Sequence, residues 1–176
     1  MPLNGSAMLA EGLPLAEDIL RFWFEDCRPW QWFRRDSEFD RSVSERFGVL
    51  AEAAQDQKLI DWEVNQTSCL ALVLLLDQFS RQIWRDQARA FQGDLLAQRL
   101  SHLALNQRWL EHEPQRPRRQ FWLMPLLHAE CLETVNKAIP LLERWVDIAT
   151  ADVARRNRDI LIKHGRYPWR DGALGR

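Results

Sequence analysis

Charged side chains follow directly on the most apolar stretch of this sequence. The run CLALVLLL, residues 69–76, passes without a break into Asp77, Gln78, Arg81 and Arg85. Residues four apart share one face of a helix, so Asp77 and Arg81 can meet if the helix continues that far. A carboxylate and two guanidinium groups at this spacing can either join helices through buried ion pairs or recognise an anion.

Two further polar groups lie in the C-terminal half of the chain. His128 and Glu130 are two residues apart, so on a helix one of them points inward and the other aside. Arg166 follows a glycine of the kind that ends helices, where an arginine can fold back on other helices. An imidazole with carboxylates and guanidinium groups can bind a carboxylate or phosphate and move a proton. We therefore predict one concave polar pocket formed by Asp77, Arg81, His128, Glu130 and Arg166.

A purely structural role explains the same residues and is favoured at this point, because buried pairing needs no ligand. Charges at the ends of apolar helices commonly pair to tie helical hairpins together, and breaking a buried pair costs about 3–5 kcal/mol. Trp84 and Trp169 likewise have two interpretations, because they could stack on a ligand ring or on the neighbouring Arg85 and Arg170. Both interpretations of this polar set therefore stay open.

Motifs for metal, nucleophilic or nucleotide chemistry are incomplete in this sequence. The segment HAEC contains the His-x-Glu of zinc deaminases but lacks the Pro-Cys-x-x-Cys pair that completes the zinc ligands. The other histidines have no useful partner spacing, and there is no His-Glu-x-x-His. Neither Gly-x-Ser-x-Gly nor a glycine-rich phosphate loop occurs. We expect no metal and no cofactor.

Charge and composition narrow the class of partner. The 176 residues carry a net charge of -1, which disfavours a nucleic acid or membrane partner held by bulk charge. Residues 1–65 contain 7 basic and 13 acidic side chains, whereas residues 151–176 contain 7 basic and 3 acidic ones. We expect the two ends to pack together and neutralise one another; the alternative is an anion site near the C-terminus.

Cysteine usage and hydropathy bear on location. Cys27, Cys69 and Cys131 are far apart and odd in number, which predicts buried thiols in a reducing compartment. The longest apolar run, residues 69–76, is far shorter than the roughly 20 residues of a membrane span. Residues 1–13 read as a loose leader without clear signal-peptide features. A cytoplasmic protein, monomer or homodimer, is expected.

Helix-forming residues dominate and few segments alternate with period two, so the chain is predicted to be all-α. Residues 14–176 would form a single domain of about seven antiparallel helices, either a bundle or a helical solenoid. Asp36, Asn65 or Thr67, and Thr150 are candidate N-caps, and Gly165 would end the last helix. The helices are expected over about residues 14–27, 37–57, 65–79, 94–108, 120–137, 140–148 and 150–164. A loop with a helical turn is expected over 80–93 and an exposed linker over 110–120.

Five blocks of the chain follow one another in a recognisable order: ILRFWFED, WQWF, LALVLLLDQFSRQIWRDQARAFQGD, FWLMPLLHAECLE and ILIKHGRYPWRDGALGR. In this register they resemble the DUF924 family, bacterial uncharacterised proteins with a tetratricopeptide-like helical fold. The resemblance implies a tetratricopeptide-like α-α superhelix and supplies no activity, substrate or cofactor. A proline, a serine and two asparagines of the family motifs are replaced here. The matching polar positions are Asp77, Arg81, His128, Glu130, Arg166 and Arg170.

Two functions follow from this sequence. The first is a binding or scaffold module for a peptide or small anionic ligand, with contacts from Arg81, Arg85, Arg166, Arg170 and Trp84. The second is a hydrolase or lyase for an acidic metabolite, in which His128 acts as acid/base and Arg81 and Arg166 clamp the anion. Glu130 and Asp77 are further catalytic candidates, and the sequence does not decide whether the protein is an enzyme.

Overall fold

The computed structural model describes residues 12–176, and in this range the chain forms helices and loops without any strand. This confirms the all-α prediction. The predicted leader, residues 1–13, lies almost wholly outside the described residues. No helix within the described range is both long and apolar enough to cross a membrane. The α-helices are α1 (Ala16–Arg21), α2 (Ser37–Gln55), α3 (Gln66–Leu74), α4 (Ser80–Ile83), α5 (Asp94–Asn106), α6 (Trp109–His112), α7 (Arg116–Leu127), α8 (Leu132–Trp145), α9 (Ile148–His164) and α10 (Asp171–Leu174).

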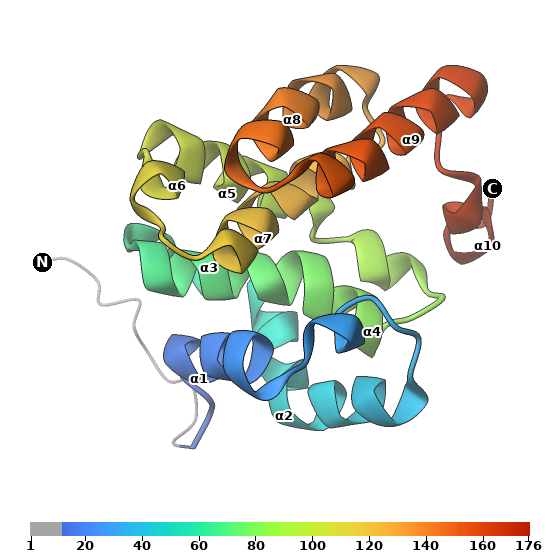
Figure 1. Cartoon of the computed structure of the whole chain (residues 1–176). Coiled ribbons are helices and arrows are strands. Elements are labelled where there is room, and N and C mark those ends of the chain that lie inside the picture. The colour runs from blue at the N-terminus through green and yellow to red at the C-terminus, as the bar shows by residue number, and fades with distance from the viewer. Residues whose placement is uncertain (1–11) are drawn as a thin grey trace, which may run out of the picture.

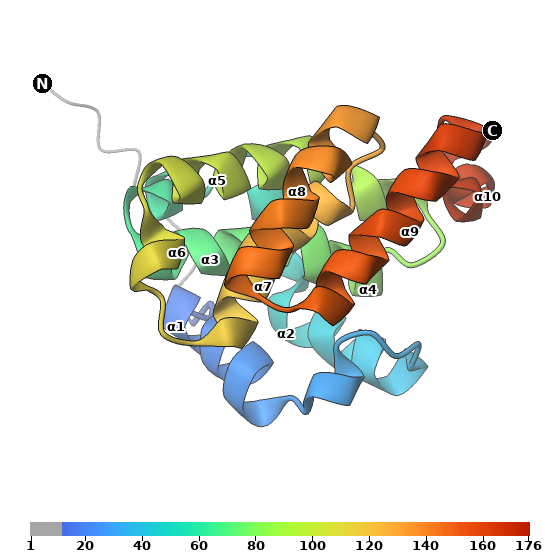
Figure 2. The same ribbon diagram turned by 45° about the horizontal axis from the view of Figure 1, so that its top comes forward.

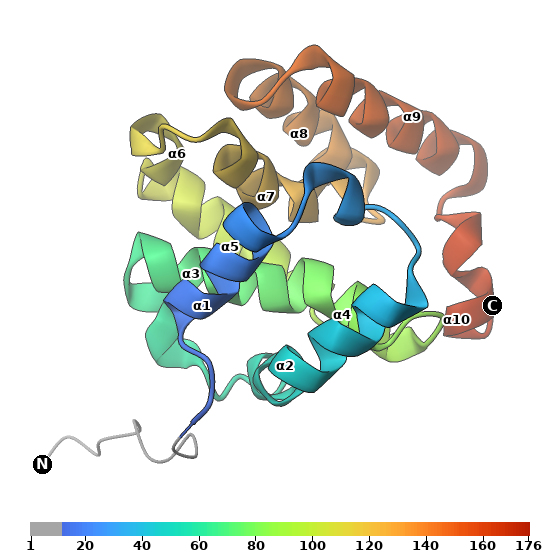
Figure 3. The ribbon, with the colours of Figure 1, turned by 60° about the horizontal axis from the view of Figure 1, so that its bottom comes forward.

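The helix α3 lies in the middle of the molecule, because every side chain from Cys69 to Leu74 is buried. On one side it contacts α1, while α2 packs on the segment that continues α3 (Figure 1, Figure 3). On the other side it contacts α5 and α7, and α8 then packs against both α7 and α9 (Figure 2). The apolar run thus forms the centre of a layered arrangement and carries its polar end into the interior.

Helix starts follow the local capping chemistry. The Asp36 carboxylate accepts hydrogen bonds from the backbone N–H of Glu38 and Phe39, which confirms the predicted cap. The Asn65 side chain accepts one from the Ser68 N–H, so of the two candidates Asn65 and Thr67 it is Asn65 that caps α3. The predicted Thr150 cap is wrong. Asp147 caps α9 instead, with Oδ1 accepting from the Thr150 N–H at 2.7 Å.

The chain stays helical beyond the predicted end at Phe79. A π-helical turn, Leu75–Phe79, follows α3 directly and leads without a break into α4. The helical turns expected within 80–93 are present, as α4 and as a 3-10 turn over Ala88–Phe91, but the first of them continues the preceding helix. The wider turn changes which side chains face inward, and Asp77 and Gln78 are both buried there. Polar residues interrupt the apolar periodicity in this stretch, which is why the sequence pattern placed the end of the helix too early.

Three other predictions about helix boundaries are wrong. The expected linker over 110–120 contains α6 and the first turn of α7. The single helix expected over 120–137 is divided by a non-helical stretch between Leu127 and Leu132. Pro125, which cannot donate a backbone hydrogen bond, lies in the last turn of α7 just before this break. Pro140 lies inside α8 and does not start a new helix.

The charge and cysteine expectations also need correction. The arginines of α9 and the following tail pair mainly with carboxylates of the C-terminal third, and no ion pair within the described range joins residues 12–65 to residues 151–176. Cys27 and Cys69 are buried as predicted, and burial raises the pKa of each thiol to about 12. Cys131 is exposed, contrary to the prediction, because the break after α7 carries it to the surface.

Candidate functional site

The π-helical turn and the end of α7 bring a carboxylate and an imidazole together. Asp77 is 1% exposed, and its Oδ1 and Oδ2 lie 2.8 and 3.0 Å from His128 Nδ1. The Gln78 amide donates a third hydrogen bond to Asp77 Oδ2 at 2.7 Å. Because the carboxylate holds Nδ1, His128 is oriented with Nε2 as its remaining ring nitrogen.

A second buried carboxylate holds two arginines. Arg81 donates to both oxygens of Asp94, with N···O distances of 2.9 and 3.0 Å, and also to the backbone oxygen of Asp77 at 2.7 Å. Arg170 donates to Asp94 Oδ2 at 3.0 Å and to the His128 backbone oxygen at 2.7 Å. Both guanidinium groups also lie over the ring of Phe91, Arg81 at 5.3 Å and Arg170 at 4.4 Å from its centroid.

We call this set of five residues the hub: Asp77, Arg81, Asp94, His128 and Arg170. Gly93 is needed to bring Asp94 into it, since a Cβ at Gly93 would lie 2.9 Å from the backbone oxygen of Leu76. The backbone at the start of α5 can therefore approach the π-helical turn closely enough for Asp94 to reach Arg81.

The charged groups of the hub shift one another's pKa values. Burial acts to raise the pKa of Asp77, but His128, Arg81 and the hydrogen bond from Gln78 outweigh it and hold that pKa at about 2. The pKa of Arg81 is raised, because Asp77 and Asp94 outweigh its burial. Burial lowers the pKa of Arg170 in spite of the attraction of Asp94. Each charge in the hub thus depends on its partners.

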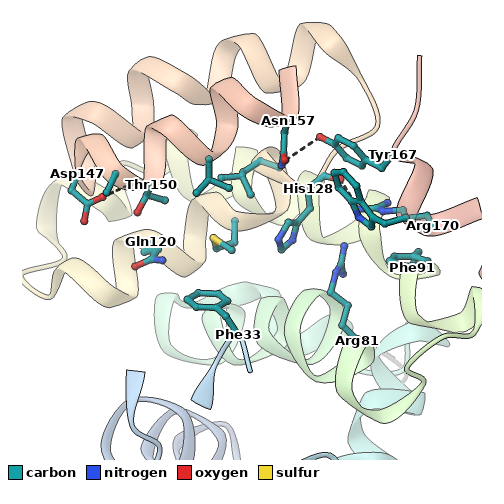
Figure 4. Close-up of a pocket in the computed structure, with 15 residues that line it drawn as sticks. Phe33, Arg81, Phe91, Gln120, His128, Asp147, Thr150, Asn157, Tyr167 and Arg170 are labelled. Carbon is teal, nitrogen blue, oxygen red and sulfur yellow. Dashed lines mark hydrogen bonds between the residues drawn. The ribbon is translucent and has the colours of Figure 1, made fainter. Parts of the chain in front are cut away.

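A cavity of about 520 Å³ opens beside the hub (Figure 4). One of its walls is α7, through Gln120, Met124, Leu127 and His128, whose spacing of four, three and one places them on one helix face. The facing wall is α9. The remaining lining residues are Phe33, Arg81, Phe91, Asp147, Ala149, Thr150, Val153, Asn157, Tyr167, Trp169 and Arg170.

Only some of the residues predicted to form one polar pocket lie together in the structure. Asp77, Arg81 and His128 meet as expected, and Arg170 joins them. Arg81, His128 and Arg170 line the cavity, whereas Asp77 lies behind His128. Three of the five side chains predicted to form the pocket therefore lie in the hub.

Glu130 and Arg166 belong to a separate group near the C-terminus, which we call the tail cluster: Glu130, Arg166, Asp171 and Arg176. Arg166 donates to Asp171 at 2.8–3.0 Å. Glu130 accepts from the Tyr167 N–H at 2.6 Å and from Arg176. Burial acts to raise the pKa of Glu130, but these hydrogen bonds lower it overall. The tail cluster fastens the chain on both sides of Tyr167 and so helps to position Arg170.

Arg85 and Trp84, both predicted to bind ligand, are not among the residues that line the cavity. Arg85 pairs with Asp40, with Nη2 and Oδ1 2.7 Å apart. Trp84 is buried, and the Arg89 guanidinium lies 4.1 Å from its ring centroid. Trp169 does line the cavity, where it stacks on Tyr167 with a centroid separation of 4.6 Å.

Sequence reasoning missed several residues that form the site. Asp94 was interpreted only as a helix start, and Phe91 fell in a predicted loop. On α9, Thr150, Val153 and Asn157 are spaced by three and four, as are the lining residues of α7. That spacing marks a shared face, but it does not distinguish a cavity wall from a core face.

The arrangement is suited to holding an anion and to moving a proton, since two guanidinium groups and an oriented imidazole border the same cavity. Within residues 12–176, no group of three or more His, Cys, Asp or Glu side chains is arranged to hold a metal ion.

Comparison with known proteins gives a family and a fold relative. Residues 19–176 match the family described as "Bacterial protein of unknown function (DUF924)". A solved structure of the protein of unknown function ATU0120 from Agrobacterium tumefaciens is 33% identical, with a TM-score of 0.84. The similarity covers 92% of this chain and 90% of that chain. No curated protein matches the sequence. The match over residues 19–176 and the similar solved structure show that this chain belongs to the DUF924 family.

Proposed function

We propose that this protein binds a small ligand carrying a carboxylate or phosphate in the cavity beside the hub. The observation that carries the proposal is that Arg81, Arg170 and His128 border one cavity while buried carboxylates hold each of them from behind. Their side chains are 20%, 7% and 19% exposed, so they are largely fixed before a ligand arrives.

Charge balance in the hub supports an anionic ligand. The negative charges of Asp77 and Asp94 are each taken up by hub partners, so the hub has no excess negative charge that would repel an anion. Arg170 Nε is also buried without a hydrogen-bond partner among the described residues. A bound carboxylate or phosphate would supply negative charge and hydrogen-bond acceptors at this place.

The rest of the lining supports a small ligand more than a long peptide. The cavity volume of about 520 Å³ lies in the range typical of small-molecule sites, about 300–1,000 Å³. Phe33 and Trp169 line it and are each 59% exposed, which gives the ligand apolar surface to cover. A peptide remains the alternative partner of this proposal.

Three further expectations belong to the proposal. The concave side of a tetratricopeptide-like α-α superhelix would suit a binding module. A cytoplasmic location agrees with the free buried thiols of Cys27 and Cys69. The protein would act as a monomer or homodimer without nucleic acid, membrane or cofactor.

Calorimetric titration with a panel of small carboxylates and phosphates tests the binding function. We expect at least one of these anions to bind, and His128→Asn to weaken that binding, because it removes the imidazole from the cavity lining while its amide can still hydrogen-bond Asp77. His102→Asn at an exposed position should leave the affinity unchanged. Absence of binding by every anion, or an unchanged affinity in His128→Asn, would refute the proposal.

Acid/base catalysis is the second candidate, and the Asp77–His128 pair favours it. A buried carboxylate that holds Nδ1 prepares Nε2 to accept a proton from a substrate or water. The protein would then be a hydrolase or lyase for an acidic metabolite, with Arg81 and Arg170 as the anion clamp in place of Arg166. Glu130 would support this site only by holding the tail.

An activity screen over phosphate esters and small acids tests the second candidate. Asp77→Asn should lower kcat and alter the pH profile with little effect on KM, because Asp77 orients the base and does not line the cavity. An activity that His128→Asn leaves intact would exclude this role for the pair.

A further inference from the structure

The two long walls of the cavity run in the same direction. At one end, Arg116 of α7 pairs with Asp147 at the start of α9, with 2.7 Å between Nη1 and Oδ2. Further along, the Asn157 amide of α9 donates to the backbone oxygen of Leu127 at the end of α7, at 3.0 Å. The lining residues of both helices therefore follow one another in the same order, and the cavity between them is elongated.

The length of this cavity can be taken from the helices. Thr150 and Asn157 are seven residues apart on α9, which corresponds to about 10 Å along the helix axis. Gln120 and His128 bracket a similar distance on α7. A ligand that contacts both ends must therefore present two polar groups about 10 Å apart.

The two ends differ in chemistry. Arg81, Arg170 and His128 lie at the hub end, whereas Asp147, Thr150 and Gln120 lie at the opposite end (Figure 4). Between them along each wall the lining is apolar, with Met124 on α7 and Val153 on α9, and Phe33 lies between the two ends in Figure 4. One end thus favours negative charge, and the middle favours hydrocarbon.

The opposite end favours hydrogen-bond donors over a second anion. The Asp147 carboxylate is negative, with one oxygen on the Thr150 N–H and the other on Arg116. Hydrogen bonding to that N–H lowers the pKa of Asp147, so it stays ionised. The Gln120 side chain makes no hydrogen bond with other described residues, so its amide is available to a ligand. A hydroxyl or amino group satisfies these acceptors, whereas another carboxylate would be repelled.

From these contacts we infer that the ligand is an elongated, two-ended molecule. Its anionic head lies against Arg81, Arg170 and His128, its apolar body follows Met124 and Val153, and a hydroxyl or amino group lies at Asp147, Thr150 and Gln120. This inference rests on the proposed function, because it assumes that the hub end holds an anion. It adds the ligand's length, its apolar body and the polarity of its second end.

A series of straight-chain probes tests the inference by calorimetric titration of the full chain. The series comprises an alkanoate, its ω-hydroxy and ω-amino analogues, the corresponding dicarboxylate, and the alkyl phosphate, each spanning about 10 Å. We expect the ω-hydroxy or ω-amino acid to bind about tenfold tighter than the plain alkanoate, and the dicarboxylate to bind no better. The alkanoate and alkyl phosphate distinguish a carboxylate from a phosphate head.

Two variants locate the second end. Thr150→Val and Gln120→Leu should reduce the preference for the ω-substituted acid to near unity while the plain alkanoate keeps its affinity. Thr134→Val is the matched control, because Thr134 is the third residue of α8 as Thr150 is of α9.

The outcomes separate the two proposals. If no probe binds, the proposed function fails and this inference fails with it. If all probes bind with equal affinity, or if Thr150→Val and Gln120→Leu retain the preference, the anion site stands and the two-ended ligand is refuted.

Discussion

Among residues 12–176, an aspartate shared by two arginines occurs twice, once in the hub and once in the tail cluster. In the hub, Asp94 holds Arg81 and Arg170, and the Asp94 and Arg170 side chains are 11% and 7% exposed. In the tail cluster, Asp171 holds Arg166 and Arg176, whose side chains are 46% and 35% exposed. The residue types and hydrogen-bond geometry are alike, and the difference is access to water.

This difference decides what each group can do. Water replaces a lost partner in the tail cluster at little cost, so its ion pairs mainly hold the chain in place. In the hub, an arginine that moved away from its carboxylate would leave a buried charge without solvent or partner. Because that is costly, the ion pairs hold the arginines in place beside the cavity. A guanidinium held in this way is prepared to receive a ligand, whereas an exposed one has its charge screened by solvent.

The largest expected effect comes from removing the shared carboxylate in the hub. Asp94→Asn should lower the free energy of unfolding by about 3–5 kcal/mol, because two largely buried guanidinium groups lose their common counter-charge. Urea unfolding followed by circular dichroism measures it. Asp171→Asn is the matched control and should leave the urea midpoint almost unchanged. Equal shifts in both variants would contradict the contrast between the two regions.

A smaller effect is expected in acid. The pKa of Asp77 is lowered from 3.8 to about 2 in the folded protein, so its contribution is complete above about pH 4. That contribution, on the order of 2 kcal/mol, should be lost as the pH falls from about 4 to about 2. The difference in unfolding free energy between the wild type and Asp77→Asn should narrow over that range. A difference that stays constant down to pH 2 would show that Asp77 is not held ionised by the hub.

The smallest effect is expected for Arg166. Arg166→Gln removes one of the two arginines on Asp171, and we expect neither the urea midpoint nor anion affinity to change measurably, since Arg166 is half-exposed and does not line the cavity. Arg170→Gln provides the comparison and should weaken anion binding at least about tenfold. A large loss of affinity in Arg166→Gln would place the tail cluster in the binding site after all.

Much of the fold was readable from local patterns. Asp36 was predicted as a cap, and Asn65 as one of two candidate caps, because such side chains satisfy the first backbone N–H groups of the following helices; the structure shows both in this role. The buried α3 followed from a run of apolar residues. The boundaries around Pro125 and Ser80 were misjudged, because a proline near a helix end and a π-helical turn depend on packing beyond the local pattern.

The candidate site was predicted by residue type more than by position. Asp77, Arg81 and His128 were expected to meet and do so. Glu130 was placed in the same pocket because it is two residues from His128, and Arg166 because it follows a helix-ending glycine, yet both lie in the tail cluster. Asp94 was missed because nothing in its surrounding sequence indicates that two arginines from distant segments converge on it.

The sequence by itself determined that the chain is helical, that α3 is buried, and that Asp77 and Arg81 share one polar segment. These properties depend on residues within a few turns of one another, where spacing fixes geometry. Only the tertiary structure decided which arginines meet Asp94 and which meet Asp171, and where a cavity remains between α7 and α9. Such choices depend on contacts between segments up to 76 residues apart, which local periodicity does not encode.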